Sequence, residues 1–203
     1  ARRLDRVLTS SEWSARQIAA DFGVAPQRIR NVYNGIDTEL YAPDAGVHKQ
    51  TDELLCVGRA NDPNKGIRTL IAALARSDRR LRLTLVDDDH PHNPVFKWAR
   101  AAGVAHRLRV TGRVATDALV DLYRRAALVV VPSRTEGFGL PAVEAMACGT
   151  PVVASRAGAL PEVMELGGGG ICVPPDDPVA LARGIEELMG DATRRAQLAA
   201  QAR

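Results

Sequence analysis

The sequence predicts an α/β fold, a doubly wound parallel sheet with helices on both faces. Short apolar runs recur along the 203 residues, helix-like segments lie between them, and most of the runs are apolar at every position. Strands that are apolar on both faces are typical of parallel sheets buried between two layers of helices. Because such sheets bind ligands beyond the carboxyl ends of their strands, we expect functional residues directly after the apolar runs.

The predicted strands and helices alternate from the beginning of the chain. Strands are expected at 6–9, 54–57, 83–86, 108–111, 128–131, 151–154 and 171–173. Helices are expected at 12–22, 66–76, 117–127, 140–148 and 178–189. Ser11 and Thr116 are the predicted capping residues of the first and third of these helices. The four glycines from Gly167 to Gly170 predict a flexible loop.

A change in composition predicts how the chain is divided. Residues 1–35 carry the first strand, the first helix and a short strand-like piece. Residues 36–52 contain proline and glycine with few apolar residues, so we expect a linker there. Regular alternation of strand and helix then defines a main domain over 53–203. The chain begins without methionine and stops within a helix-like segment, so we expect a longer protein.

Bulk composition excludes several classes of protein. Hydrophobic residues make up 46% and charged residues 25%, as in ordinary globular domains. The net charge of +3 is spread along the chain without interleaved aromatic residues, so no nucleic-acid partner is expected. The spacing of Cys56, Cys148 and Cys172 matches neither a disulfide framework nor a metal-binding motif, so these cysteines are expected to be reduced. No apolar run reaches the roughly 20 residues of a membrane span, so a cytoplasmic location is expected.

Two basic residues follow the strand predicted at 54–57. Arg59 comes directly after Gly58, and Lys65 precedes Gly66 at the start of the next predicted helix. Helix starts attract anions, arginine can bind a phosphate through two hydrogen bonds, and lysine adds a point charge. A solvated basic loop explains this spacing equally well. Lysine is scarce among the 27 basic residues, however, which favours a role in binding a diphosphate.

The segment from Ser133 to Glu144 follows the most apolar predicted strand and is the stronger candidate site. Gly137 and Gly139 allow the backbone to approach a ligand closely. The N–H groups of Phe138, Gly139 and Leu140 are expected to be unpaired at the start of the next helix. They therefore predict a second anion site.

Two carboxylates, Glu136 and Glu144, lie on either side of this glycine-rich turn. A carboxylate beside phosphates repels them, but it accepts hydrogen bonds from hydroxyl groups such as those of a sugar. Taken alone, Glu144 is explained more simply by pairing with the helix dipole, and Glu136 by an exposed loop. The combination with the glycine-rich turn favours a site that reads hydroxyl groups.

The run Asp87-Asp88-Asp89, followed by His90 and His92, offers a second interpretation. Aspartates after a strand bind a divalent metal and donor phosphates in the GT-A glycosyltransferase fold, and such side chains also ligate zinc. A polar loop at a strand end is the favoured explanation, because the metal interpretation leaves the segment with Glu136 and Glu144 unused.

The run Glu136-Gly-Phe-Gly-Leu-Pro-Ala-Val-Glu144 resembles the Glu-x7-Glu motif of retaining glycosyltransferase family 4, which has the GT-B fold. Gly58-Arg59 and Lys65-Gly66 resemble the basic pair of that family. Further matches are Val131-Pro132-Ser133, Ala145 to Val153, Gly158-x-x-Pro161-Glu162 and Val173-Pro174-Pro175-x-Asp177. The resemblance runs from about residue 54 to 190, and weakly back to residue 6.

The resemblance implies a Rossmann-like C-terminal half of a GT-B enzyme, which binds the nucleotide-sugar donor over residues 53–203. Residues 1–35 would be the end of an N-terminal acceptor domain, and 36–52 the hinge. Most of the acceptor domain would be missing, so we expect donor binding but poor turnover from this chain alone. The acceptor stays unidentified, and peripheral membrane contact through the missing domain stays open.

The resemblance also implies a role for each site residue. Arg59 and Lys65 would hold the diphosphate, and Glu136 would bind the transferred sugar. Glu144 would bind the ribose. The other binding residues would contact the donor through their backbone: Gly58, Gly137, Phe138, Gly139 and Leu140 near the phosphates and sugar, and Arg113 and Val114 near the base. No metal or other cofactor is expected. The alternative is a non-catalytic module of the same fold that binds a nucleotide sugar or acts as a scaffold.

Overall fold

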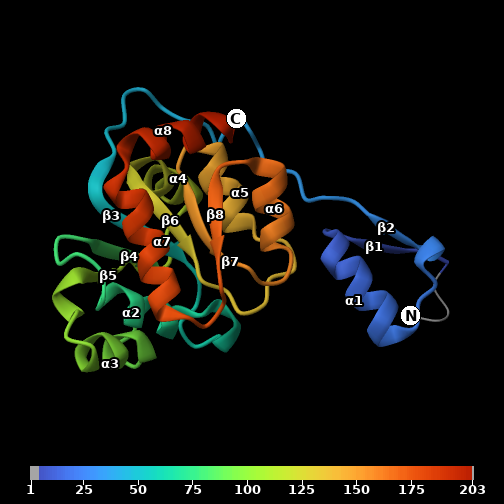
Figure 1. Ribbon diagram of the computed structural model, residues 1–203, viewed down its shortest axis with the longest axis horizontal. Helices are drawn as coiled ribbons and strands as arrows, with labels where there is room; N and C mark the ends of the chain where they lie inside the picture. The colour runs from blue at the N-terminus through green and yellow to red at the C-terminus, as the bar shows by residue number, and fades with distance from the viewer. Residues whose placement is uncertain (1–4, 203) are drawn as a thin grey trace.

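The computed structural model describes residues 5–202 and shows a larger α/β unit joined by extended chain to a small N-terminal segment (Figure 1). Within these residues the larger unit holds a six-stranded parallel sheet with the order β5-β4-β3-β6-β7-β8. Its strands are β3 (Gln50–Val57), β4 (Arg82–Val86), β5 (Leu108–Val110), β6 (Ala126–Val131), β7 (Val152–Ser155) and β8 (Gly170–Val173). The predicted doubly wound parallel sheet is confirmed.

Helices cover both faces of this sheet. One face carries α2 (Ile67–Leu74), α3 (Pro94–Ala101) and α7 (Pro178–Gly190); the other carries α4 (Thr116–Arg125), α5 (Leu140–Ala147) and α6 (Leu160–Gly167). The last helix, α8 (Ala192–Gln201), packs on α7. Successive strand residues face opposite sides, so Leu54 and Cys56 enter one core and Leu55 enters the other. All six residues of β6 are buried, which accounts for its uninterrupted apolar run.

The order of the strands places a topological switch point at the carboxyl ends of β3 and β6. From β3 the chain moves outward through β4 to β5, then returns to β6 on the other side of β3. The loops that leave β3 and β6 therefore lead away in opposite directions, and ligands bind at such switch points. These two loops carry the basic residues and the glycine-rich segment singled out in the sequence.

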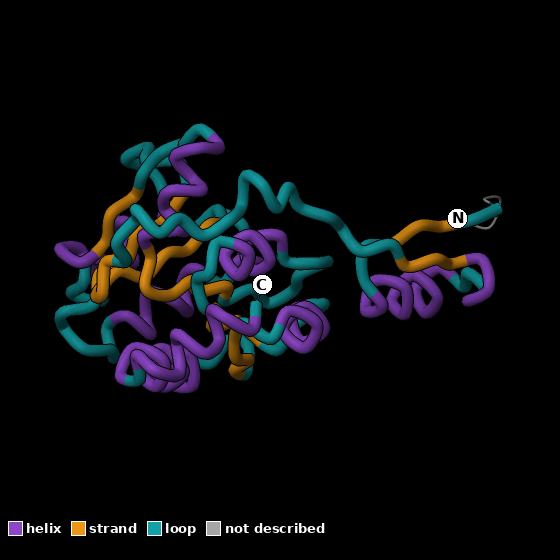
Figure 2. The backbone as a smooth tube through the Cα atoms, turned by 90° about the horizontal axis from the view of Figure 1, so that it is seen from above, coloured by secondary structure: helices purple, strands orange, loops and turns teal. Residues whose placement is uncertain are grey.

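The N-terminal segment consists of β1 (Val7–Thr9), α1 (Glu12–Phe22), a 3-10 turn (Pro26–Arg28) and β2 (Ile29–Asn31). β1 and β2 form a parallel pair, which Figure 2 shows at one end of the molecule. Ser11 caps α1 as predicted, because its Oγ accepts a hydrogen bond from the N–H of Ser14 at 3.0 Å. The division of the chain at 35 and 52 stays a prediction. Residues 1–4 and Arg203, at the predicted cut ends, lie outside the described residues.

One local prediction is wrong, and a second is wrong in part. The N-cap of α4 is Ala115, and Thr116 is the first helical residue without a capping hydrogen bond. The segment Gly167–Gly170 is a loop only in part: Gly167 ends α6, Gly170 begins β8, and Gly168 and Gly169 connect them. A Cβ on Gly170 would lie 2.4 Å from the carbonyl oxygen of Val152, so close packing explains this glycine. Cys56 and Cys148 are buried free thiols, and Cys172 is a half-buried one.

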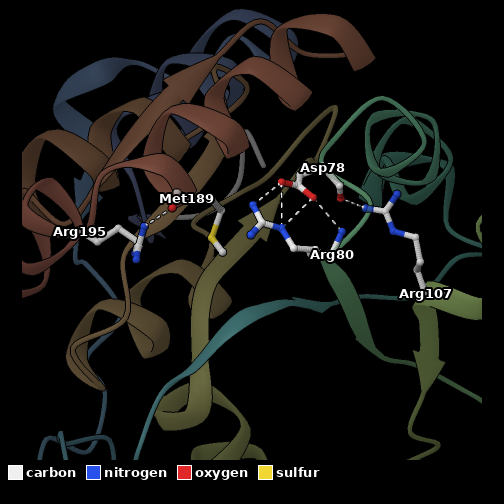
Figure 3. A network of polar contacts seen from close by, with 5 residues as sticks. All are labelled: Asp78, Arg80, Arg107, Met189 and Arg195. Atoms are coloured by element: carbon white, nitrogen blue, oxygen red, sulfur yellow. Dashed lines mark hydrogen bonds and ion pairs between the residues drawn. The ribbon is translucent and has the colours of Figure 1, made fainter.

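A buried arginine, Arg107, lies at the amino end of β5 and binds the segment that leads into β4. Arg107 donates hydrogen bonds to the carbonyl oxygens of Leu74 and Leu81 at 2.9 and 2.7 Å. It also donates to the carbonyl oxygen of Asp78 at 2.6 Å, and the Asp78 carboxylate pairs with Arg80 (Figure 3). A buried cation is stable only with such hydrogen-bond partners, so the guanidinium of Arg107 has a structural role.

A hollow of about 990 Å³ surrounds this junction, at the end of the sheet opposite the switch point. Arg195, which lines it, donates to the carbonyl oxygens of Leu188 and Met189 at the end of α7 (Figure 3). Despite its size, this hollow is not the candidate site, because it lies at the amino ends of the strands, whereas parallel sheets bind ligands at the carboxyl ends. Among the helices of residues 5–202, none is long and apolar enough to cross a membrane.

Candidate functional site

The loop after β3 places Lys65 at the switch point. Asp62 caps a 3-10 turn (Pro63–Lys65) by accepting the N–H of Asn64 at 2.9 Å, and α2 begins after Gly66. Gly66 has φ of +63°, and a Cβ there would lie 1.9 Å from the carbonyl oxygen of Pro132. Only glycine accepts both this backbone conformation and this approach. The β3 loop therefore packs directly on the chain that leaves β6.

The loop after β6 presents unpaired N–H groups at the start of α5. Gly139 is the N-cap, with φ of +104° and no side-chain hydrogen bond. Within residues 5–202 the N–H groups of Phe138, Gly139 and Leu140 have no acceptor. Unpaired N–H groups at a helix start form a favourable site for an anion.

Lys65 and Glu136 meet between the two loops. Lys65 Nζ lies 2.8 Å from Glu136 Oε2, and Ser133 Oγ donates to the same oxygen at 3.1 Å. The two charged side chains are only 29% and 15% exposed. The N–H of Arg134 also donates to the carbonyl oxygen of Asn64 at 2.7 Å, so backbone joins the loops as well. The arrangement places a cation, a carboxylate and free N–H groups at one edge of the sheet.

The backbone of Glu136 is held by the loop between β7 and α6. The N–H of Ala159 donates to the carbonyl oxygen of Glu136 at 2.9 Å. Gly158 has φ of +59°, and a Cβ there would lie 2.1 Å from the same oxygen. This close approach explains why glycine opens the Gly158-x-x-Pro161-Glu162 motif seen in the sequence.

Arg59 is not part of the Lys65–Glu136 cluster. Its side chain is 74% exposed, and its nearest carboxylate is Asp62 at 3.9 Å. Arg59 lines a hollow of about 550 Å³ together with Gly112 and Arg113, beyond the ends of β4 and β5. The structure thus brings Arg59 near Arg113, the residue predicted to lie near a base, and not near Glu136. Val114 follows Arg113 and is half-buried.

The Asp87–Asp89 run follows β4, and its first carboxylate accepts hydrogen bonds from two of the loops around this hollow. Asp87 Oδ2 accepts the N–H of Ala60 at 2.7 Å and the side-chain amide of Asn93 at 2.8 Å. The carboxylate therefore fixes the backbone beside Arg59, which sequence reasoning missed. The rings of His90 and His92 lie 5.1 Å apart. In residues 5–202 no three His, Cys, Asp or Glu side chains converge as metal ligands, and the hydrogen bonds agree with the favoured polar-loop interpretation.

Glu144 is oriented by a buried tyrosine. Tyr123 Oη donates to Glu144 Oε2 at 2.7 Å, and the edge of the Tyr41 ring packs on Tyr123 with centroids 6.3 Å apart. Burial and the neighbouring Glu144 charge raise the pKa of Tyr123 well above its usual value, so the phenol stays a donor. Sequence reasoning missed Tyr123, because its position on α4 gave only a helical apolar pattern.

The sheet order and these loops define a Rossmann-like α/β domain of the type found in GT-B glycosyltransferases. The family model described as "Glycosyl transferases group 1" matches residues 37–203, and the chain belongs to this family.

Named relatives and solved structures agree with this assignment. The MMP α-(1→4)-mannosyltransferase of Mycolicibacterium hassiacum is 39% identical over 166 residues, which are 81% of this chain and 40% of that protein. Sucrose-phosphate synthase from Thermosynechococcus elongatus superposes with a TM-score of 0.88 at 30% identity, covering 98% of this chain and 53% of that one. Anabaena HepE, solved with UDP and glucose, superposes with a TM-score of 0.86 at 27% sequence identity, covering 99% of this chain and 58% of that one. The chain thus spans about half the length of these proteins.

Proposed function

We propose that this chain is the donor-binding part of a retaining glycosyltransferase of family 4, which transfers a sugar from a nucleoside-diphosphate sugar to an acceptor hydroxyl. The contact between Lys65 Nζ and Glu136 Oε2, at 2.8 Å, carries the proposal. This contact supports the proposal because a cation that could bind phosphate and a carboxylate that could accept hydrogen bonds from hydroxyls lie side by side at the switch point, as the joined phosphate and sugar of such a donor would require.

The diphosphate would be bound by Lys65 and by the N–H groups of Phe138, Gly139 and Leu140 at the start of α5. Arg59 is exposed and unconstrained apart from the 3.9 Å contact with Asp62, so it is free to turn toward the phosphates. These groups favour the charge that develops on the leaving phosphate more strongly than the charge of the bound donor, which is how fixed cations and dipoles accelerate a reaction.

The two carboxylates would read hydroxyl groups at the two ends of the donor. Glu136 would accept hydrogen bonds from the transferred sugar, next to the phosphate site. Glu144, held by Tyr123 Oη, would accept hydrogen bonds from the ribose. The backbone of Gly58 would face the phosphates, and that of Arg113 and Val114 the base. A fixed carboxylate would distinguish a ligand that has the hydroxyl from an analogue that lacks it, because the analogue would leave the carboxylate without its hydrogen bond.

In the proposed reaction the bond between the anomeric carbon and the diphosphate breaks on the side from which the acceptor oxygen arrives. The acceptor hydroxyl gives its proton to the departing phosphate, so the configuration at the anomeric carbon is retained. Lys65, Arg59 and the N–H groups supply the positive charge, and we propose that no metal or other cofactor takes part. The acceptor, and any peripheral membrane contact, would belong to the portion of the longer protein outside this chain.

Calorimetry on this chain tests donor binding. The probes are UDP, GDP, ADP and UDP-glucose, each titrated with and without EDTA, and UDP comes first because HepE was solved with it. We expect at least one nucleoside diphosphate to bind equally well in both conditions. Absence of binding to all four would refute the donor role. Binding that disappears with EDTA would refute metal independence.

We propose that transfer needs an acceptor-binding portion beyond this chain, because the chain spans about half the length of its relatives, and we would test transfer on such a longer protein. We expect its product, observed by NMR, to keep the anomeric configuration of the donor. Inversion would contradict the retaining assignment. Donor binding with no transfer to any sugar, lipid or water acceptor would favour the non-catalytic module instead.

A further inference from the structure

One carboxylate, that of Glu162, binds two segments near the N-terminus to the larger unit. Glu162 Oε1 accepts the N–H of Glu12 at 2.9 Å, and Oε2 accepts the N–H of Trp13 at 3.2 Å. Tyr33 Oη donates to Oε1 at 2.7 Å. Figure 1 shows α1 facing the side of the larger unit that carries α6. Four residues from three segments thus meet at the first turn of α6.

The chemistry of this contact is specific. The first N–H groups of a helix have no partner within the helix and carry partial positive charge, so a carboxylate there is stabilised. Ser11 already accepts the N–H of Ser14, and Glu162 supplies an acceptor for Glu12 and Trp13. Burial acts to raise the pKa of Glu162, but the hydrogen bonds from Glu12, Tyr33 and Trp13 outweigh it, so the pKa lies below its ordinary value.

A second contact joins the same segment to the glycine-rich loop. Ser11 Oγ donates to the carbonyl oxygen of Gly137 at 2.7 Å, and Ser14 Oγ lies 3.2 Å from the same oxygen. The ring of Tyr33 packs at 6.3 Å from that of Phe138. Gly137 stands between Glu136 and the unpaired N–H groups of the anion site. Its carbonyl is therefore held by residues from outside the α/β unit.

We propose that Glu162 is a positioning residue: it latches α1 onto α6 and thereby sets Ser11 against the Gly137 carbonyl, so that the N-terminal segment completes the donor loop. The role of the loop in donor binding rests on the proposed function, whereas the latch itself does not. Closing the latch fixes the peptide groups whose N–H bonds would face the phosphate. Donor binding and closure then act on one loop, and each must favour the other by the same factor.

Amide exchange measured by NMR on this chain without ligand tests the latch. Within residues 5–202 the N–H groups of Glu12 and Trp13 have no acceptor other than Glu162. In Glu162→Gln one oxygen is replaced by a donor amide and the charge is lost. We expect these two amides to exchange about tenfold faster, the size of effect typical of losing a charged hydrogen bond. The Ser14 amide, bonded to Ser11 Oγ, should keep at least part of its protection and serves as an internal reference.

The matched control is Glu165→Gln, which changes an exposed glutamate on the same helix. It should leave all three amides unchanged. Tyr33→Phe provides a second variant, because it removes the hydroxyl and keeps the ring that packs on Phe138; a smaller acceleration is expected. Exchange at Glu12 and Trp13 that is the same in Glu162→Gln as in the unmodified chain would overturn the latch.

UDP then tests the positioning role. In the unmodified chain we expect saturating UDP to slow exchange at Glu12 and Trp13, and in Glu162→Gln we expect UDP to bind several-fold more weakly, whereas Glu165→Gln binds normally. A latch that opens in the variant with no change in UDP affinity would overturn the positioning role. If UDP, GDP and ADP all fail to bind the unmodified chain, the proposed function fails, while the ligand-free exchange still decides the latch.

Discussion

Lys65 and Glu136 are 71 positions apart in the chain and form a 2.8 Å ion pair. They meet because β3 and β6 are neighbours in the sheet, so the loops that leave these strands emerge side by side. The ammonium therefore already has a partner in the chain without ligand. In the proposed function Glu136 would compete with a phosphate for Lys65 and would also accept hydrogen bonds from the sugar.

This competition predicts opposite effects on two ligands. In Glu136→Gln the carboxylate charge is removed and Lys65 becomes free for phosphate. We expect bare UDP to bind at least as tightly as in the unmodified chain, and UDP-glucose to lose about 1.5–3 kcal/mol of affinity, as for a hydrogen bond to a charged group. Calorimetry with both ligands measures the difference, with Glu165→Gln as the control. Equal weakening of both ligands would show that Glu136 does not read the sugar.

Removing the cation should weaken both ligands. In Lys65→Ala the phosphate would lose a partly buried cationic partner, and Glu136, which is 15% exposed, is left with Ser133 Oγ. We expect losses of about 2–3 kcal/mol for UDP and UDP-glucose alike. Arg59→Ala should cost less, because its exposed side chain must be ordered before it can bind. An Arg59 effect equal to that of Lys65 would mean that the loop rearranges when the donor binds.

Tyr123 supplies a prediction about the ribose. Tyr123→Phe removes the hydroxyl that orients Glu144 and keeps the buried ring. We expect the preference for UDP over 2′-deoxy-UDP to fall by about 1 kcal/mol, because a mobile carboxylate discriminates less well. Comparing two ligands on the same variant cancels any general loss of stability. An unchanged preference, with UDP bound normally, would separate Tyr123 from ribose recognition.

The sheet was predictable from the sequence because a strand buried on both faces leaves a local signal. The apolar runs at β3, β4 and β6 can be recognised from a few consecutive residues each. The switch point then predicted that Lys65 and the glycine-rich loop lie together at the carboxyl ends of the strands. Contacts such as Tyr123 with Glu144, or Glu162 with α1, gave no such signal, because they depend on how distant segments are aligned. Arg59 shows the same limit: its position along the chain was clear, but the direction of its flexible side chain was not.

Gly66 tests whether the packing between the two loops maintains the site. Gly66→Ala adds a Cβ 1.9 Å from the Pro132 carbonyl oxygen at a φ of +63°, so the loops must separate. Gly103→Ala is a matched control, because its φ is +72° and nothing lies within 4 Å of the added atom. We expect the control to lose about 1 kcal/mol of unfolding free energy from backbone strain, and Gly66→Ala to lose more and to bind UDP weakly. Urea unfolding of both variants measures the difference, and equal losses would contradict the predicted clash.

Lys49 predicts an unusual dependence of stability on pH. Its Nζ donates to the carbonyl oxygens of Arg124 and Ala126 and to Thr150 Oγ1, and among residues 5–202 it has no carboxylate partner. Removal of solvent from the ammonium lowers the pKa of Lys49 from 10.5 to about 8, although the residue stays exposed over part of its surface. Below pH 8 the folded and unfolded chains both carry the proton, and the folded state bears the cost of partly desolvating the charge. Between pH 8 and 10.5 the folded state releases the proton first, so the contribution of Lys49 to stability rises with pH. Because the residue is partly exposed, solvent screening keeps this gain below the value that the shift in pKa alone would give.

The comparison with Lys49→Met isolates this effect, since methionine has a similar length and no charge. Urea unfolding at pH 7.5, 8.5 and 9.5 should show the unmodified chain gaining stability relative to the variant across the series. Burial raises the pKa of the nearby Cys148 thiol to about 11, so this thiol stays protonated in the folded state over that range and, being present in both chains, drops out of the difference. A difference that is independent of pH would mean that the Lys49 ammonium keeps its proton, stabilised by its three oxygen acceptors despite burial.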